Sequence, residues 1–278
     1  MRRIANIAAE AFRQFLQDDG WAIASHIALS MLMSLFPFVL VLTALAGIFG
    51  SSDLANEATR ILLETWPEEV AAPLAVEVHG VLTSAQGSTL TVGVLLAVYF
   101  SSSGIEGLRV GLNRAYSVVE RRAWWVLRIE SIVYVVLGAV ALLALSFLIL
   151  LAPLIWRAAL KYMPWIEPFS GIITLTRFAA AGLVLVVALT IVHFWLPAGR
   201  RTLREIAPGI VATLALWLIA GALFGRYLAE FAFTYAIYYA GLASVMIVLV
   251  YLYLTASIFI YGAELNAVIR ARRANNPS

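Results

Sequence analysis

Long apolar runs separated by short polar segments dominate this chain. Six of them have close to the about 20 residues with which a helix crosses the hydrocarbon core of a bilayer. They cover residues 26–50, 88–108, 129–152, 172–196, 206–225 and 240–263. The pattern predicts an all-α polytopic membrane protein with six transmembrane helices. Pro208-Gly209 is expected to open the fifth of them, because proline is tolerated in the first turn of a helix.

Basic residues gather in alternate connections between these runs. Fourteen of the 19 Lys and Arg residues lie in the N-terminal segment, in the second connection with its flanks, in the fourth connection and in the C-terminal tail, and five lie elsewhere. Positive charge accumulates on the cytoplasmic side of membrane proteins. The asymmetry therefore predicts that both termini are cytoplasmic and that the connection at 51–87 faces the periplasm.

Two segments outside the spans show helical periodicity. Within 1–20, one face carries apolar residues, which predicts an amphipathic helix that either lies in the cytoplasmic interface or packs against the ends of the spans. The connection at 51–87 holds six acids and one Arg, and predicts two short amphipathic helices. With a cytoplasmic tail at 267–278, the chain is expected to form a single membrane domain over 1–278.

Composition supports this interpretation. Apolar residues make up 63% of the chain and charged residues 13%, whereas about a quarter of a soluble domain is charged. The absence of cysteine excludes disulfides and thiolate chemistry. The net charge of +3 does not indicate nucleic acid as a partner, because the arginines lie just outside apolar spans, where topology and anionic lipid explain them.

Motifs of enzymes and of cofactor sites are missing from the sequence. It has neither a phosphate-binding Gly-Lys-Ser/Thr loop nor a Gly-x-Ser-x-Gly elbow. The three histidines, His26, His79 and His193, are far apart and lack the spacing of metal ligands. We therefore expect a protein that is not an enzyme and that uses neither a cofactor nor a metal.

The richest polar cluster begins within the cytoplasmic end of the second apolar run, where Ser101-Ser102-Ser103-Gly104 interrupts it. Polar and ionisable groups at such a depth are costly unless they are paired or hydrated, so they mark candidate binding residues. The candidate substrate-binding residues are Ser101, Ser102, Ser103, Arg109, Asn113, Arg114, Arg121, Arg122, Glu264 and Asn266. We expect Asn113, Arg114 and Glu264 to meet at the cytoplasmic mouth of the bundle, with the serines above them. Alternatively, the span ends near Ser101 and continues as a cytoplasmic helix, and Glu264 makes only a structural ion pair.

Six blocks in order resemble the YihY/BrkB family of bacterial inner-membrane proteins, once labelled ribonuclease BN. The resemblance covers about 20–268. The blocks are Ala28-Leu29-Ser30 through Leu35-Phe36-Pro37, Leu112-Asn113-Arg114-Ala115-Tyr116 with Glu120-Arg121-Arg122, Leu196-Pro197, Ala207-Pro208-Gly209, Tyr239-Ala240-Gly241-Leu242-Ala243, and Gly262-Ala263-Glu264-Leu265-Asn266-Ala267. The chain departs from the family at Ser25-His26-Ile27, where members often have Ala-Tyr-Tyr, and at Tyr239-Ala240-Gly241, where they often have Tyr-Gly.

The resemblance implies a multi-pass protein of the bacterial inner membrane, with a role in handling envelope lipids. Hydrolysis of RNA is not expected, because that chemistry needs a positioned acid–base pair or metal carboxylates, and the candidate groups are dispersed. Two functions remain open. The protein transports or flips an anionic envelope lipid or a related amphiphile, or it is a non-transporting scaffold of the cell envelope. Membrane lipids are the expected partners, and homo-oligomers or complexes with envelope proteins stay open.

Overall fold

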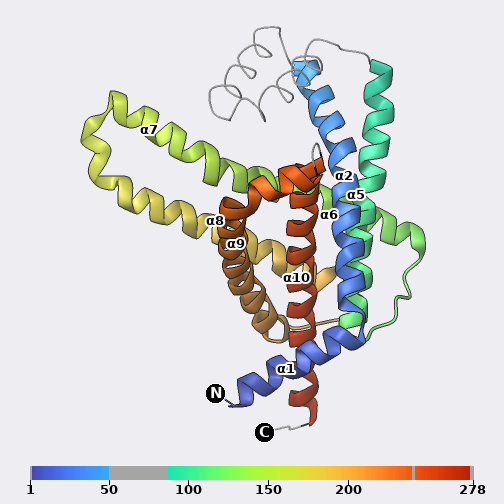
Figure 1. Cartoon of the computed structure of the whole chain (residues 1–278). Helices are drawn as coiled ribbons and strands as arrows, with labels where there is room; N and C mark the ends of the chain where they lie inside the picture. The colour runs from blue at the N-terminus through green and yellow to red at the C-terminus, as the bar shows by residue number, and fades with distance from the viewer. Residues whose placement is uncertain (1, 50–86, 240–241, 276–278) are drawn as a thin grey trace. The chain divides into compact units, whose positions relative to one another are not determined.

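The computed structural model describes residues 2–49, 87–239 and 242–275, and every regular element within them is helical (Figure 1). The predicted connection at 51–87 lies outside these residues except for Gly87. The described elements are α1 (Arg2–Gln17), α2 (Gly20–Phe49), α5 (Gly87–Ala115), α6 (Trp124–Ser146), the π-helix η1 (Phe147–Leu151), α7 (Ala152–Tyr162), the 3-10 helix η2 (Pro164–Phe169), α8 (Ser170–Trp195), α9 (Leu203–Tyr239) and α10 (Ala243–Asn275).

The chain divides into two compact units. One contains Met1–Leu29 with Ile105–Ser278, and the other contains Ser30–Gly104. The larger unit holds α1 and α6 to α10, and carries nearly all of the polar groups discussed below. A single membrane domain over the whole chain remains a prediction.

Four apolar helices in the described residues are long enough to cross a membrane. They cover Trp124–Ile149, Pro164–Trp195, Leu203–Phe231 and Ala243–Ala274, and so match the third to sixth predicted spans. The first two predicted spans are also helical, in α2 and α5. Little of the four helices is buried inside the protein. Their exposed aliphatic side chains suit a lipid environment, in which helices are not driven together by the hydrophobic effect.

Helix α1 packs against α10, and the two helices cross near the C-terminal end of α10 (Figure 1). Ala11 and Phe15 are buried, whereas Phe12 is 47% exposed. The Tyr261 hydroxyl donates to the Ala8 carbonyl at 3.2 Å, and Arg272 Nε donates to the Glu10 carboxylate at 2.9 Å. The apolar face of α1 therefore has two parts. One part packs against α10, and the other is exposed, which is also what a helix lying in the membrane interface requires.

A tight link joins α1 to α2 and requires a glycine. Asp19 adopts a left-handed conformation with φ of 53°, a region that Asp and Asn tolerate better than most residues. Gly20 then begins α2 against the ring of Phe15. A Cβ at Gly20 would lie 2.4 Å from that ring, so a larger residue would displace Phe15 from the contact between α1 and α10.

Helices α9 and α10 approach each other through glycines. A Cβ at Gly209 would lie 2.1 Å from the Gly262 carbonyl oxygen, and a Cβ at Gly262 would lie 2.1 Å from Thr213 Oγ1. Close backbone approach at small residues is how helices associate in membranes. The Asn266 carboxamide oxygen accepts a hydrogen bond from the Gly209 N–H at 2.6 Å, which ties the helices together.

The prediction that Pro208-Gly209 opens this helix is wrong, because α9 begins at Leu203 and Pro208 lies inside it. Proline lacks the N–H that would bond to the carbonyl four residues earlier, which here belongs to Arg204. The Arg273 guanidinium donates to that carbonyl at 3.4 Å. The helix therefore continues through the proline with the freed acceptor satisfied by a cation from α10.

Candidate functional site

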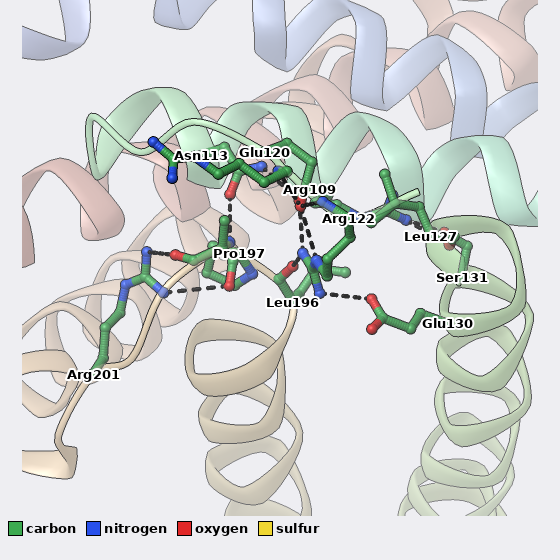
Figure 2. Close-up of polar contacts among 12 residues, drawn as sticks. Arg109, Asn113, Glu120, Arg122, Leu127, Glu130, Ser131, Leu196, Pro197 and Arg201 are labelled. Atoms are coloured by element: carbon green, nitrogen blue, oxygen red, sulfur yellow. Dashed lines mark hydrogen bonds and ion pairs between the residues drawn. The ribbon is translucent and has the colours of Figure 1, made fainter. Parts of the chain in front are cut away.

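Two connections meet at the arginine-rich end of the larger unit: residues 116–123 between α5 and α6, and residues 196–202 between α8 and α9. Asn113, in the last turn of α5, joins them (Figure 2). Its carboxamide oxygen accepts a hydrogen bond from the Ala198 N–H at 2.7 Å, and its amide donates to Glu120 at 3.2 Å. Asn113 is buried, so a single amide fixes one loop against the other.

Glu120 and Arg122 form the centre of the same junction. Arg122 donates to Glu120 through Nε at 2.9 Å and through NH2 at 2.7 Å, in the bidentate geometry that suits Arg and carboxylate. Backbone N–H groups of Arg121 and Arg122 add two bonds of 3.1 Å. These bonds, the Arg122 side chain first, lower the pKa of Glu120 to about 2, against the opposing effect of burial. The carboxylate is therefore ionised at any physiological pH.

Arg122 uses its remaining donors on two other elements. NH1 pairs with Glu130 of α6 at 2.7 Å, and NH2 donates to the Leu196 carbonyl at the end of α8 at 3.0 Å (Figure 2). The same guanidinium thus holds α6, α8 and the loop at Glu120. Its role in the structure is to fasten this end of the helices.

The guanidinium of Arg109 is also occupied by hydrogen bonds within the protein. It is 2% exposed, and its NH2 donates to the Leu127 carbonyl at 3.0 Å and to the Ser131 hydroxyl. Both acceptors belong to α6. Arg109 therefore joins α5 to α6 within the larger unit.

A second, buried polar network links α8 and α10 through Tyr116, and Asn266 extends it to Gly209 of α9. The Asn266 amide donates to the Tyr116 hydroxyl oxygen at 3.2 Å, which leaves the phenolic proton to bond to His193 Nδ1 at 3.0 Å. Burial raises the pKa of Tyr116 to about 12, so the hydroxyl keeps its proton. All three side chains are buried. A neutral tyrosine bridging an amide and an imidazole fits a structural role.

Arg201 covers this network. Its guanidinium carbon lies 4.1 Å from the centre of the Tyr116 ring, and NH2 donates to the Ala198 carbonyl at 2.9 Å. A cation over an aromatic face is stabilising, the more so when it is desolvated. Burial lowers the pKa of Arg201, which is 5% exposed.

A cleft of about 950 Å³ opens beside these contacts, between residues 117–122 and 194–201. Arg121 and Arg200 line it together with the apolar side chains of Val119, Phe194 and Trp195. Val119 is 78% exposed and Trp195 59% exposed. Within the part of the chain that the structure describes, no carboxylate pairs with the guanidinium of Arg121 or of Arg200. The cleft therefore combines two available cations with an aromatic and aliphatic wall.

An apolar groove of about 440 Å³ lies farther along α8, between that helix and α6. Its wall includes Tyr134 and Leu137 from α6, and Val184 and Ile191 from α8. Ile191 is three residues from Phe194 of the cleft, so the groove and the cleft are about one helical turn apart on α8. An apolar groove at this place is suited to hydrocarbon.

The remaining predicted site residues lie in different places. Arg114 donates to Asp19 at 2.8 Å, and it is close enough to Glu264 to act on it electrostatically. Glu264 is buried on α10, and Asn266 belongs to the Tyr116 network. The expected meeting of Asn113, Arg114 and Glu264 in one substrate site stays a prediction.

The predicted serines lie within α5 and bond to its backbone. Ser102 and Ser103 donate to the Tyr99 carbonyl at 2.8 and 3.1 Å, as hydroxyls in a helix interior do. α5 runs unbroken from Gly87 to Ala115, which agrees with a span that continues as a helix beyond Ser101. These serines belong to the smaller unit, and their position above the other residues stays a prediction.

Sequence reasoning did not single out Glu120, Tyr116, His193, Arg200 or Arg201 as members of this site. For three of them the sequence carries a signal, because Tyr116 and Glu120 stand in a block that resembles the family, and His193 lies near the end of the predicted span 172–196. Within the described residues, no group of three or more His, Asp or Glu side chains is placed to hold a metal ion.

Comparison with known proteins bears on the whole chain. The family model described as Virulence factor BrkB matches residues 11–278. A ribonuclease-like protein of Bacillus subtilis (strain 168), YfkH, is 25% identical over 265 residues, which are 95% of this chain and 95% of that protein. A UPF0761 membrane protein of Rhodospirillum centenum (strain ATCC 51521 / SW) is 22% identical over 274 residues, 96% of this chain and 58% of that protein. No solved structure matches the chain. The chain belongs to the BrkB family.

Proposed function

We propose that this protein binds an anionic envelope lipid, or a related amphiphile, at the cleft and moves it between the leaflets of the bacterial inner membrane. The observation that supports this most is the pairing of two available arginines with an apolar wall, one helical turn from an apolar groove. An amphiphile presents the same two chemistries. The proposal includes the six-span topology with both termini in the cytoplasm, for which the charge asymmetry is the support.

The head group would bind to Arg121 and Arg200. The planar guanidinium can donate two hydrogen bonds to a phosphate, which makes arginine well suited to a phosphorylated head group. Trp195 lies at the same rim, where an indole can remain between hydrocarbon and water. The acyl chains would lie along the groove between α6 and α8. Arg109 and Arg122, both predicted as substrate ligands, would support the cleft by holding α5, α6 and α8.

No catalytic step is part of this proposal. The sequence lacks an ATP-binding loop, so transport would run downhill, use an ion gradient, or depend on a partner protein.

A transport assay tests the proposal. The protein is reconstituted in liposomes, and the redistribution of a labelled anionic phospholipid between leaflets is followed with and without an imposed proton gradient. We expect Arg121→Gln/Arg200→Gln to slow it by roughly tenfold or more, the equivalent of about 1.4 kcal/mol in lost charge-assisted bonds. The control, Arg13→Gln/Arg204→Gln, removes the same charge from exposed positions outside the cleft and should act like the parent.

Two results would contradict the proposal. A double variant at the cleft that moves lipid as fast as the parent would show that the cleft is not the site. A parent no faster than empty liposomes under either condition would favour the scaffold function instead.

A further inference from the structure

Glu264 lies in an unusual environment for a carboxyl group. The residue is 1% exposed, and both of its carboxylate oxygens are buried without a hydrogen bond from any N–H or O–H group of the described residues. Burying a charged carboxylate without partners is costly. The acid that interacts with it is Asp18, at the turn between α1 and α2. Asp18 carries a carboxyl group too, so a hydrogen bond between the two needs a proton on one of them.

The cations nearby do not supply that partner. Arg114 acts on Glu264 from a distance, but its guanidinium bonds to Asp19 and is 45% exposed. Arg270, farther along α10, pairs with Glu205 of α9 at 3.6 Å. Tyr116 interacts electrostatically with Glu264 from the end of α5, and it keeps its own proton. Neither arginine therefore forms an ion pair with the Asp18–Glu264 pair.

Two carboxyl groups at hydrogen-bonding distance are satisfied by a single shared proton, because two adjacent negative charges repel each other. We propose that Asp18 and Glu264 hold one proton between them and form a proton-binding site that fastens the α1–α2 turn to α10. Asp18 follows directly after α1, and Glu264 belongs to α10, the helix on which α1 packs.

A route for the proton is present. Asp18 lines a pocket of about 560 Å³ with Gln14 and Gln17 of α1 and Arg270 of α10. Glu264 is buried on α10 three residues before Ala267, which belongs to the pocket wall. The pocket therefore gives water access to the Asp18 side of the proposed site. Loss of the shared proton would leave two charges in contact and push the turn away from α10.

This site goes beyond the proposed lipid function and does not depend on it. The test uses the full chain in nanodiscs without added substrate, so its outcome is separate from that of the transport assay. Infrared spectra are recorded during a pH titration, and the carboxylic-acid C=O band is followed. We expect the band at neutral pH in the parent, its loss at alkaline pH, and its absence in Glu264→Gln.

Asp18→Asn gives the sharper result. The asparagine amide can donate to the Glu264 carboxylate, so Glu264 can ionise more easily and the band should disappear at a pH lower by about one unit or more. Glu10→Gln is the matched control on α1. Because Glu10 is paired with Arg272, this control should leave the titration unchanged.

The proposal is overturned if the band persists in Glu264→Gln, or if Asp18→Asn leaves the titration midpoint where it is in the parent. The second outcome would mean that Glu264 is a neutral acid without a carboxyl partner. Should Glu264→Gln fail to fold, Asp18→Asn still decides the question, because Asp18 lies at the wall of the pocket.

Discussion

Replacing Glu120 by glutamine removes one charge from the junction of the two loops and keeps the shape of the side chain. The lowering of the Glu120 pKa from 4.5 to about 2 corresponds to roughly 3 kcal/mol of stabilisation, at 1.36 kcal/mol for each pKa unit. Because the Glu120 side chain is 22% exposed, solvent screening reduces that figure, and we expect Glu120→Gln to cost about 1–3 kcal/mol at neutral pH. Arg122 keeps its bonds to Glu130 and Leu196 in the variant.

The pH dependence has a definite sign. The folded-state pKa of Glu120 is depressed, so its stabilisation is complete above about pH 4.5 and is lost as the pH falls toward 2. The parent should therefore lose stability on acidification more steeply than Glu120→Gln, and the two unfolding temperatures should converge at low pH.

Thermal unfolding followed by tryptophan fluorescence in detergent, from about pH 7 to about pH 3, measures both effects. At neutral pH the expected cost lowers the midpoint by about 2–12 °C. Glu106→Gln is the control, because Glu106 is 52% exposed and lies 3.4 Å from Arg128, so its cost should stay within about 0.5 kcal/mol. Equal midpoints for the parent and Glu120→Gln at neutral pH, or parallel acid profiles, would refute the reasoning.

Three further predictions address the helix contacts and the topology. Gly262→Ala should lower the free energy of unfolding by about 1–3 kcal/mol in the same assay, because its Cβ would meet Thr213 Oγ1 at 2.1 Å; an unchanged midpoint would argue against close α9–α10 packing. Tyr116→Phe should cost about 1–3 kcal/mol, since it leaves the Asn266 amide and His193 Nδ1 without their shared partner, and stability equal to the parent would show that the network carries no energy. In intact spheroplasts, an impermeant thiol reagent should label Ser52→Cys and not Ser278→Cys; the reverse pattern would overturn the orientation.

The positions of the helices could be predicted from the sequence because they depend on the local pattern of apolar residues. An apolar run of about 20 residues defines a span by its length, and α6, α8, α9 and α10 follow those runs. The apolar face of α1 was also visible. The prediction at Pro208 failed for a tertiary reason. The helix continues through the proline, and Arg273, 69 residues after Arg204, donates to the freed Arg204 carbonyl.

The hydrogen-bond partners of the site residues could not be predicted from the sequence. Arginine suits phosphate and carboxylate equally well, so the sequence could not show that Arg122 is occupied by Glu120 and Glu130. The bonds to the Leu196 carbonyl and the Ala198 N–H use backbone groups, which every residue carries and which leave no signature. The partner of Tyr116 is likewise 77 residues away, and only the packed structure brings the two together.

Direct lipid binding tests the central claim that the cleft holds an anionic head group. The purified protein is titrated with a phosphatidylglycerol or a phosphatidylcholine of the same chain length, and complexes are counted by native mass spectrometry, with inorganic phosphate as a competitor that has no acyl chains. The account predicts preferential retention of phosphatidylglycerol, little competition by phosphate, and loss of that preference in Arg121→Gln/Arg200→Gln but not in Arg13→Gln/Arg204→Gln. Equal retention of both lipids by the parent, or an undiminished preference in the cleft variant, would contradict it.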